Sequence, residues 1–565
     1  MRMSEQRHAV RCGFLTRLPF FLLALGLLVL YVRLPYRILN SDVAIFGLMG
    51  EDILRYGYLP TYAYGQDYLF SILPYVYATV QWLAPTLSNI LTLKLAGFAL
   101  SITGLGLLFE ALLLAQRQTG WSRGVAATIF CLLVASSSSY LFDIQEHSSL
   151  EISLFLLGFI SFFTARIEVA LAERGQSHGV DWLLLGLGLA HALYSRPLVF
   201  AYGLMMLIGL IAAEWRRAPG WRLCRPLFWL LVGALLGYLP IILHEMLRAP
   251  TWPYDFHTHT PLWHCDKQHP GLIIFWTMFR ILFDLRMGHL WFSVGIILWL
   301  LCTGWCVTRY LRRERQRWLT ALDVALPLGT VWIITVMIAF PNLSVNMTNR
   351  RYCEHAFLAA VWLFARFAPP TFHRPWWAAV GAGLVLLASV QSWRPRLSYE
   401  THVNDTLAQQ LPAMVAELKS YQAPILADFW AAYQLRFIAD GDLLIEAYPW
   451  QFIRTYNAIP REAMERRCLW LVHEKAIGEM KKLIAWHAHP GSWEQRPVYT
   501  LHTPLLFRQF EYWELGGPTT PKEWQERENK AELNYYLWEL DPHESVRLMN
   551  SLNPRYFTTP YPPRP

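Results

Sequence analysis

Charged residues are scarce in this chain. Aspartate, glutamate, lysine and arginine make up 16% of its 565 residues, whereas hydrophobic residues make up 54%. About a quarter of an average soluble domain is charged. The composition therefore argues against a large soluble core and indicates an integral membrane protein.

Several motifs that would define a soluble enzyme are also missing. The eight cysteines are scattered and form no CxxC pair, so neither a zinc framework nor a disulfide framework is indicated. The chain has no Walker loop, no GxGxxG before a helix and no GxSxG elbow, so an ATP or nucleotide-sugar site has no support. No small-residue cleavage site follows the first apolar stretch, so a cleavable signal is not indicated.

The net charge of +8 does not indicate nucleic-acid binding, because the cations form short clusters between long apolar stretches. This is the positive-inside pattern of a membrane protein. A span needs about 20 mostly apolar residues, and we expect about eleven of them. They lie at residues 14–33, 89–115, 124–141, 150–168, 182–197, 198–214, 225–244, 289–308, 320–341, 352–368 and 375–392.

A further apolar stretch, 68–83, is short and is broken by Pro74. If it lies on the outer surface as an interfacial helix, the strong basic clusters all fall on one side of the membrane. That side is then the cytoplasm, where the N-terminus also lies. If it crosses, most of those clusters move outside. We therefore expect an interfacial helix, with outer regions at 34–88, 142–149, 245–288 and 342–351.

The chain after residue 392 differs in composition and is expected outside the membrane. Polar helix-like stretches at 404–421 and 475–487 alternate with strand-like runs at 425–428, 443–447 and 469–473. This alternation predicts a small α/β domain. The expected layout is a transmembrane module at 1–392, an extracytoplasmic α/β domain at 393–510 and an extended or loosely packed tail, rich in Pro and Trp, at 511–565.

The first outer loop contains the most informative carboxylate, Asp42. Ile45, Phe46, Met49 and Ile53 recur at helical spacing and predict a helix on the membrane surface that begins near Asp42. Asp42 could simply complement the helix dipole. It could instead accept a proton from an acceptor hydroxyl or hold a divalent metal. Two later acids of the same helix, Glu51 and Asp52, are expected to be solvated.

Other polar residues fall at predicted outer ends of spans. Asp143, Glu146 and His147 occupy the second outer link and could face Asp42, although short outer links are usually polar; His147 and Asp42 could share a metal. Arg350 and Arg351 break the positive-inside trend and could bind phosphate, a lipid headgroup or a carboxylate of the C-terminal domain. Further candidates are Lys94 and Arg196 as phosphate ligands, Glu110 and His191 within spans, and a histidine-rich loop at 257–269.

The segments "SDVAIFGLMGEDILRYGYLP", "YGQDYLFSILPYVYA", "DIQEHSSLE" and "NRRY" follow one another in an order that resembles GT-C fold glycosyltransferases. The pattern is similar to the bacterial group related to dolichyl-phosphate-mannose protein mannosyltransferases and the lipid A aminoarabinose transferase. "PILADFWAAYQLRFIADGDLLIEAYP" resembles the extracytoplasmic domain of some members. The resemblance implies a multi-pass protein of the bacterial inner membrane.

The resemblance also implies a function. A polyprenyl-phosphate sugar would be the donor, and a lipid, glycan or protein hydroxyl would receive the sugar on the extracytoplasmic face. Asp42 would be the first-loop acid, Asp143 or Glu146 the second acid, and Arg351, beside Arg350, the basic residue of the "RY" element. Alternatives are a lipid or solute transporter, a ligase that uses a pyrophosphate-linked glycan, or a non-catalytic membrane partner. A transporter would place its polar sites near the midplane of repeated, broken helices.

The topology predicts that residue 72 and the C-terminus both lie outside the cytoplasm. Reporter tags fused at these two positions should be accessible to an impermeant reagent in intact cells. A tag after residue 220, in a predicted cytoplasmic loop, should remain protected. Protection of the tag at residue 72 would contradict the surface location of 68–83.

Overall fold

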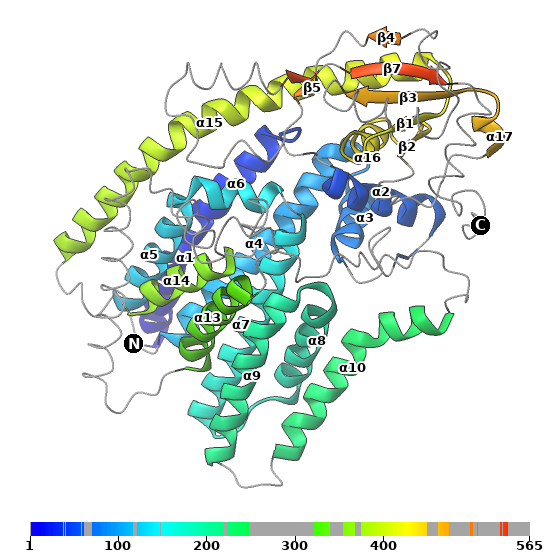
Figure 1. The fold of residues 1–565 in the computed structure, drawn as a ribbon. Coiled ribbons are helices and arrows are strands. Elements are labelled where there is room, and N and C mark those ends of the chain that lie inside the picture. The colour runs from blue at the N-terminus through cyan, green and yellow to red at the C-terminus, as the bar shows by residue number, and fades with distance from the viewer. Residues whose placement is uncertain are drawn as a thin grey trace. The chain divides into compact units, whose positions relative to one another are not determined.

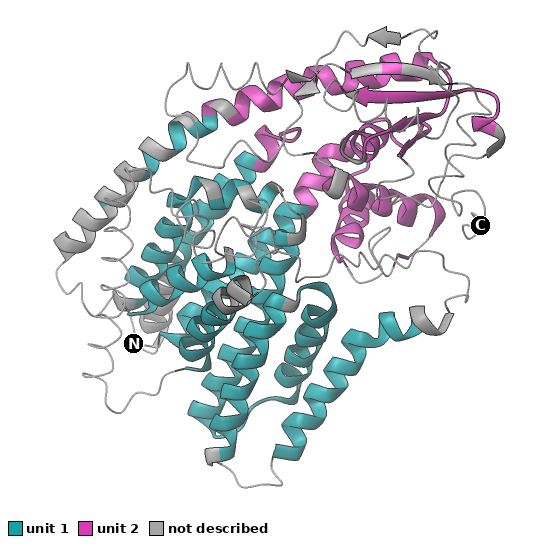
Figure 2. Ribbon diagram, viewed as in Figure 1, with its two compact units in different colours: residues 1–30, 97–243, 259–397 teal, residues 31–96, 244–258, 398–565 magenta. Residues whose placement is uncertain are grey.

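The structure is a computed structural model. It describes residues 2–37, 39, 41–57, 59–60, 71–116, 121–146, 148–217, 223–247, 320–339, 354–367, 375–448, 461–473, 498–500, 505–506, 532–533 and 535–540. The chain divides into two compact units (Figures 1 and 2). Unit 1 comprises residues 1–30, 97–243 and 259–397, and unit 2 comprises residues 31–96, 244–258 and 398–565.

Unit 1 is built from apolar helices. Those that lie wholly or partly in it are α1 (Arg2–Arg33), α4 (Asn89–Ala115), α5 (Trp121–Ser136), α6 (Ser138–Glu146), α7 (Ser148–Arg174), α8 (Gly179–Ser195), α9 (Pro197–Arg217), α10 (Cys224–Leu247), α13 (Ala321–Ala339), α14 (Glu354–Phe367) and α15 (Pro375–Ser420). Among the described residues, five helices are long and apolar enough to cross a membrane. They are Phe14–Arg33, Asn89–Ala115, Leu150–Arg174, Leu198–Trp215 and Cys224–Leu243.

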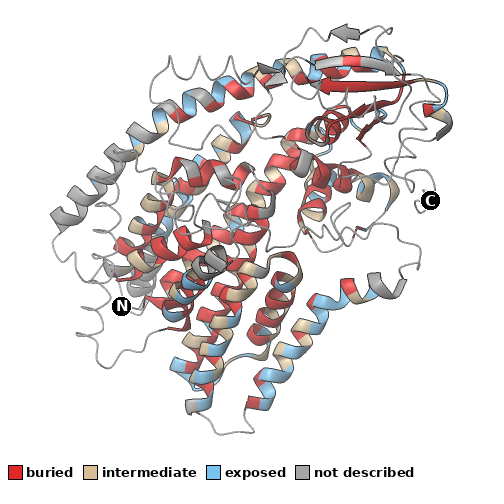
Figure 3. Ribbon diagram, viewed as in Figure 1, coloured by how far each residue is buried: buried red, intermediate tan, exposed pale blue. Residues whose placement is uncertain are grey.

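The exposed side chains of α10 show why these helices suit a bilayer. α10 carries few buried residues, whereas α7 is mostly buried (Figure 3). The exposed large apolar residues of α10 are Leu227, Phe228, Leu231, Leu235, Leu236, Leu239 and Leu243. Water would oppose so much exposed apolar surface, and lipid chains would not. The chain is a multi-pass membrane protein.

Most predicted spans coincide with or overlap a helix. The span predicted at 89–115 coincides with α4. The span predicted at 289–308 lies outside the described residues, so the expected number of spans is not confirmed. The described part of 68–83 forms α3 (Leu73–Leu83), a helix of 11 residues. At 1.5 Å per residue it is about 16 Å long, too short for a hydrocarbon core of about 30 Å.

The prediction of one continuous span at 124–141 is wrong. α5 ends at Ser136, and a new helix, α6, begins at Ser138. The Ser137 hydroxyl accepts a hydrogen bond from the Tyr140 amide at 3.2 Å, and the Ser137 carbonyl accepts one from Leu141 at 3.1 Å. A serine that caps the next helix in this way ends the preceding one, because its side chain competes for backbone amides.

Glycines let pairs of helices in unit 1 approach closely. A Cβ at Gly104 of α4 would overlap the backbone at Leu154 of α7, and a Cβ at Gly158 of α7 would overlap the Gly104 carbonyl. The backbones of α8 and α10 also approach closely, because a Cβ at Gly186 would overlap the Leu230 carbonyl. Backbone contact of this kind strengthens van der Waals packing where no hydrophobic effect drives helices together.

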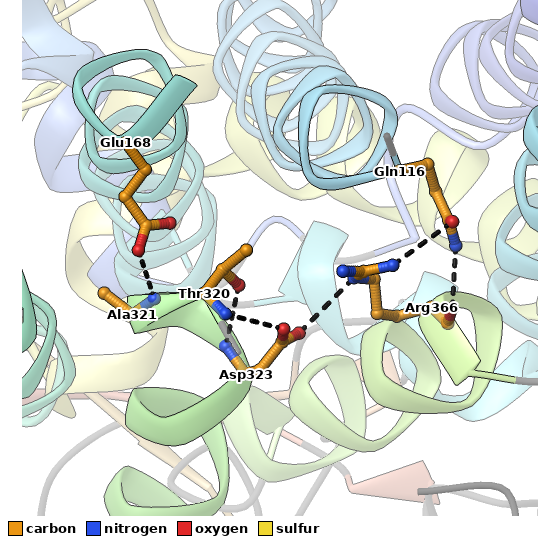
Figure 4. Close-up of polar contacts among 6 residues, drawn as sticks. All are labelled: Gln116, Glu168, Thr320, Ala321, Asp323 and Arg366. Carbon is orange, nitrogen blue, oxygen red and sulfur yellow. Dashed lines mark hydrogen bonds and ion pairs between the residues drawn. The ribbon is translucent and has the colours of Figure 1, made fainter. Parts of the chain in front are cut away.

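A buried polar cluster joins four helix ends in unit 1 (Figure 4). The Thr320 hydroxyl accepts from the Asp323 amide at 3.2 Å, and the Asp323 carboxylate accepts from the Thr320 amide at 2.9 Å. This reciprocal pair is a capping box at the start of α13. The Glu168 carboxylate of α7 accepts from the Ala321 amide at 2.5 Å. Amides that the helix itself cannot pair are thus satisfied.

The same cluster extends to α4 and α14 through Arg366. The guanidinium lies 3.5 Å from the Asp323 carboxylate and donates to the Gln116 side chain at 3.2 Å. Gln116 in turn donates to the Arg366 carbonyl at 2.7 Å. The ends of α4, α7, α13 and α14 therefore meet on one side of unit 1. The positive-inside assignment places all four of these ends on one side as well.

Unit 2 contains a mixed sheet with the strand order β2-β1-β3-β7-β4. β1 (Ile425–Ala427), β2 (Ile445–Ala447) and β3 (Cys468–His473) are parallel and lie at the three runs predicted as strands. β7 (Tyr535–Leu540) and β4 (Val498–Thr500) complete it in antiparallel pairings. β7 comes from the region predicted to be an extended or loosely packed tail, and its six residues are extended as a strand of this sheet.

The remaining described elements of unit 2 are α2 (Ser41–Tyr56), α3, α16 (Phe429–Ile438), α17 (Arg461–Met464) and the strands β5 (Leu505–Leu506) and β6 (Glu532–Leu533). The predicted first outer loop thus belongs to the same unit as the C-terminal sheet. The boundary expected between residues 392 and 393 falls inside α15, a helix of 46 residues that ends at Ser420. Helix 475–487 lies outside the described residues.

A buried ion pair joins the start of this loop to α15. The Arg37 guanidinium donates twice to the Glu400 carboxylate, once at 2.9 Å, and both side chains are almost completely buried. Beside the pair, the Tyr36 amide donates to the Asn404 side chain at 2.9 Å. Residues far apart in sequence are thereby fixed to one another inside unit 2.

Loss of Arg37 alone should leave the Glu400 charge buried without its partner. We expect Arg37→Met to lower the free energy of unfolding by about 3 to 5 kcal/mol. The double variant Arg37→Met/Glu400→Leu should recover most of that loss, because no charge then remains buried. Thermal melting of the detergent-purified proteins measures both effects. A double variant no more stable than Arg37→Met would contradict this account of the pair.

Candidate active site

Asp42 lies in the first turn of α2, as predicted, and its side chain lies outside the described part of the structure. The rest of α2 differs from the expectation of a helix with one apolar stripe. Every residue from Val43 to Glu51 is buried. α2 packs against α3 and α16 in unit 2. The backbone that carries Asp42 is therefore held by protein on several faces.

The expectation that Glu51 is solvated is wrong. Its side chain is buried, and its carboxylate accepts a hydrogen bond from the side-chain amide of Asn89 at 2.6 Å. The same Asn89 nitrogen donates to Asp440 at 2.6 Å, and the Arg55 guanidinium lies 3.6 Å from Glu51. Burial raises the Glu51 pKa to about 8, the nearby Arg55 opposes this shift, and Asp440 adds to it.

The second outer link forms α6 and the start of α7. Asp143 and Glu146 lie in the last turns of α6, but their side chains, and the whole of His147, lie outside the described part of the structure. The structure therefore does not distinguish Asp143 from Glu146 as the second acid, and both stay predictions. Ile144 and Gln145 between them are buried.

Sequence reasoning missed a carboxylate in the same region, Glu151. It lies in the first turn of α7, is buried, and packs directly on the α4 backbone at Gly97, where a Cβ would overlap the carboxylate. The signal available was a glutamate at the edge of an apolar span, a position where ionisable residues are often functional. Its position also suits a purely structural first-turn acid.

Arg196 is a predicted phosphate ligand in unit 1 whose position and side chain the structure describes. It ends α8, where its amide donates to the Ala192 carbonyl at 2.8 Å, and its carbonyl accepts from the Phe200 amide in α9 at 3.1 Å. The guanidinium is partly buried, and its charge acts on His355 in the first turn of α14. The structure thus brings Arg196 to the start of α14.

The other predicted phosphate ligands have different outcomes. Arg350 and Arg351 precede α14 in sequence and lie outside the described residues. Lys94 lies in the second turn of α4, is buried and belongs to unit 2. A buried lysine requires compensating partners, which makes Lys94 more informative than an exposed lysine.

Two weaker candidates have structural partners. Glu110 of α4 forms an ion pair with Arg17 of α1, with the closest atoms 2.5 Å apart. The Tyr194 hydroxyl donates to the Gly237 carbonyl at 3.0 Å and lies 2.9 Å from the Nδ1 atom of His191. The ion pair links α4 to α1. His191 contacts Tyr194 within α8, and the Tyr194 hydroxyl links α8 to α10. These structural contacts are sufficient to explain both side chains.

The predicted metal ligands are not tested. Among the described residues no group of three or more His, Cys, Asp or Glu side chains could hold a metal ion. The Asp42 side chain, His147 and the histidine-rich loop at 257–269 lie outside that part of the structure. Metal binding at Asp42 and His147 therefore stays a prediction.

Comparison with known proteins gives one clear result. No family model and no curated protein matches the chain. A solved structure of similar fold is the crystal structure of ArnT from Cupriavidus metallidurans bound to undecaprenyl phosphate. The match covers 88% of this chain and 98% of that chain, with a TM-score of 0.50 and 13% sequence identity. The predicted relationship to the GT-C fold is confirmed at the level of the fold.

Burial of Glu51 should make the stability of unit 2 depend on pH. The folded state holds a proton on Glu51 up to a pKa of about 8, whereas the unfolded state releases it near 4.5. The folded state therefore binds more protons between these values, and stability falls as pH rises from 4.5 to 8. Glu51→Gln, which keeps the shape and the acceptor oxygen, should melt above the wild type at pH 9.

The advantage of Glu51→Gln should shrink as the pH is lowered toward 5. Melting curves of the two detergent-purified proteins across this range measure the difference. An equal difference at pH 5 and pH 9 would show that Glu51 does not titrate in the folded state as its burial requires.

Proposed function

We propose that the chain is a glycosyltransferase that moves a sugar from a polyprenyl-phosphate donor to a hydroxyl acceptor on the extracytoplasmic face of the membrane. The observation that carries the proposal is the ArnT-like fold over 88% of the chain, because the ArnT structure holds undecaprenyl phosphate. Such a donor needs an apolar groove between membrane helices for its prenyl chain and polar groups at the membrane surface for its phosphate. A fold of this type combines the two.

The proposed donor-phosphate ligands are Arg196, Arg350, Arg351 and Lys94. The leaving group is a lipid monophosphate, whose negative charge increases as the glycosidic bond breaks. Fixed cations stabilise that charge, and guanidinium groups do so through paired hydrogen bonds. The electrostatic interaction between Arg196 and His355 at the start of α14 supports a basic site at this position, immediately after Arg350 and Arg351 in sequence.

The proposed base is Asp42. The acceptor oxygen forms a bond to the anomeric carbon of the sugar, the bond from that carbon to the phosphate oxygen breaks, and the polyprenyl phosphate leaves with the electron pair. The acceptor proton passes to the Asp42 carboxylate. Asp143 or Glu146 would support the reaction as a second acid, and Glu151 is an additional candidate for that role. Alternatively, Asp42 and His147 would hold a divalent metal that polarises the acceptor.

The proposed location of the reaction follows from topology. Residues 31–96 and 398–565 form one unit, which supports a location of the Asp42 loop and the C-terminal sheet on the same side of the membrane. The positive-inside pattern places that side outside the cytoplasm and the N-terminus inside. Undecaprenyl-phosphate sugars are therefore the donor class to test, with the sugar and the acceptor left open.

The decisive variant is Asp42→Asn. Membranes that contain the wild type should remove radiolabelled sugar from at least one of a panel of undecaprenyl-phosphate sugars. Asp42→Asn should reduce this transfer by more than about 100-fold, as expected when a positioned base is lost. Asp52→Asn, on the same helix, is the matched control and should retain transfer. Expression level and elution volume in detergent should match the wild type for both variants.

Sugar transfer by Asp42→Asn at the wild-type rate would refute the assignment of Asp42 as the base. No transfer from any donor by the wild type, with movement of intact donor across sealed vesicles, would favour a transporter instead. Loss of transfer in a chelator and its recovery with a divalent cation would favour the metal-ligand role of Asp42 over the role of base.

A further inference from the structure

α2 carries two glycines, and an aromatic ring occupies the space beside each of them. A Cβ at Gly47 would overlap the ring of Phe437 in α16, and a Cβ at Gly50 would overlap the ring of Tyr77 in α3. The two rings contact each other edge to face, with centroids 6.2 Å apart and planes at 62°. The α2 backbone therefore lies directly against both rings.

Glycine inside a helix costs about 1 kcal/mol relative to alanine. α2 has two, one turn apart, in a stretch where every residue is buried. The close approach of both rings accounts for this cost, because no other residue would let them touch the backbone. A methyl group added at either glycine would therefore require α2 or the facing ring to move.

Polar contacts fix the next turn of α2 to the end of α16. Asn89 donates from one nitrogen to Glu51 of α2 and to Asp440, at 2.6 Å each. Asp440 follows α16 in a left-handed turn, with φ of 55°, and Gly441 continues it with φ of 76°. The Gly441 amide donates to the Arg436 carbonyl at 3.0 Å, which closes the turn on α16. The side-chain amide of Asn89 therefore connects α2 to a hydrogen-bonded turn at the end of α16.

We propose that α16 and the turn at 439–442 position the helix that carries Asp42, with Gly47, Phe437 and Asn89 as positioning residues of the reaction. This inference rests on the proposed function. Asp42 precedes Gly47 by five residues in one continuous helix, a separation of about 7.5 Å along the axis. A shift of α2 at Gly47 is therefore transmitted to Asp42. Misplacement of a reacting group by about 1 Å can cost about 100-fold in rate.

The test uses a pair of compensating substitutions in the full-length protein. Gly47→Ala should displace α2 and lower kcat for sugar transfer by about 100-fold, with the KM for the donor unchanged. Phe437→Leu removes the ring that the new methyl group meets. The double variant Gly47→Ala/Phe437→Leu should restore kcat to within about tenfold of the wild type, as expected for coupled neighbours.

Gly26→Ala is the matched control, because a Cβ at this helical glycine of α1 would meet no atom within 4 Å. It should leave kcat unchanged. Full kcat in Gly47→Ala would overturn the proposal. A loss of kcat that the double variant does not restore, or one that follows a loss of thermal stability in both variants, would also overturn it.

Hydrogen–deuterium exchange provides a measurement that does not depend on activity. Amides in residues 41–56 should exchange faster in Gly47→Ala and return toward wild-type protection in the double variant. This pattern in a protein that transfers no sugar would overturn the proposed function while supporting the positioning of α2. Unchanged exchange in Gly47→Ala would overturn the positioning role.

Discussion

An apolar environment solvates neither a charged group nor a backbone amide that lacks a hydrogen-bond partner. Several buried polar side chains of this chain meet that constraint through hydrogen bonds and ion pairs. In unit 1, Thr320, Asp323 and Glu168 satisfy the first amides of α13, while Arg366 forms an ion pair with Asp323 (Figure 4). In unit 2, Arg37 and Glu400 are buried only as a pair. Helix ends are therefore joined to other helix ends. The contacts that satisfy single groups also determine which helices are neighbours.

The features that could be predicted from the sequence are those that depend on local composition. The apolar stretch at 89–115 is uninterrupted, so its ends are the ends of α4. The strands β1, β2 and β3 follow short apolar runs between polar segments. The break at Ser137 depends on which serine caps the next helix, and four serines stand in a row there. β7 becomes a strand because β3 and β4 lie on either side of it, which no local pattern reveals.

The residues of the candidate site show the same difference between local features and features that depend on distant partners. Asp42 could be proposed because a polar residue after an apolar span begins a helix with regular apolar spacing. Glu51 was expected in solvent because it lies more than two helical turns beyond Asp42 in the same loop. Its burial depends on Asn89 and on the turn at Asp440, which lies 351 residues from Asn89. Arg196 was one of several equivalent cations until the fold placed it near His355. Charges gain meaning from partners that are distant in sequence, and only the fold identifies those partners.

The ion pair between Arg37 and Glu400 also has a consequence for biosynthesis. Its two residues are separated by 363 positions. A ribosome adds about 5 to 20 residues per second, so Arg37 is synthesised roughly 20 to 70 s before its partner. During this interval the nascent first loop has neither Glu400 nor the sheet of unit 2 to pack against. Until the last third of the chain has been synthesised, the apolar residues of this loop therefore need another cover, which the membrane surface or a chaperone can provide.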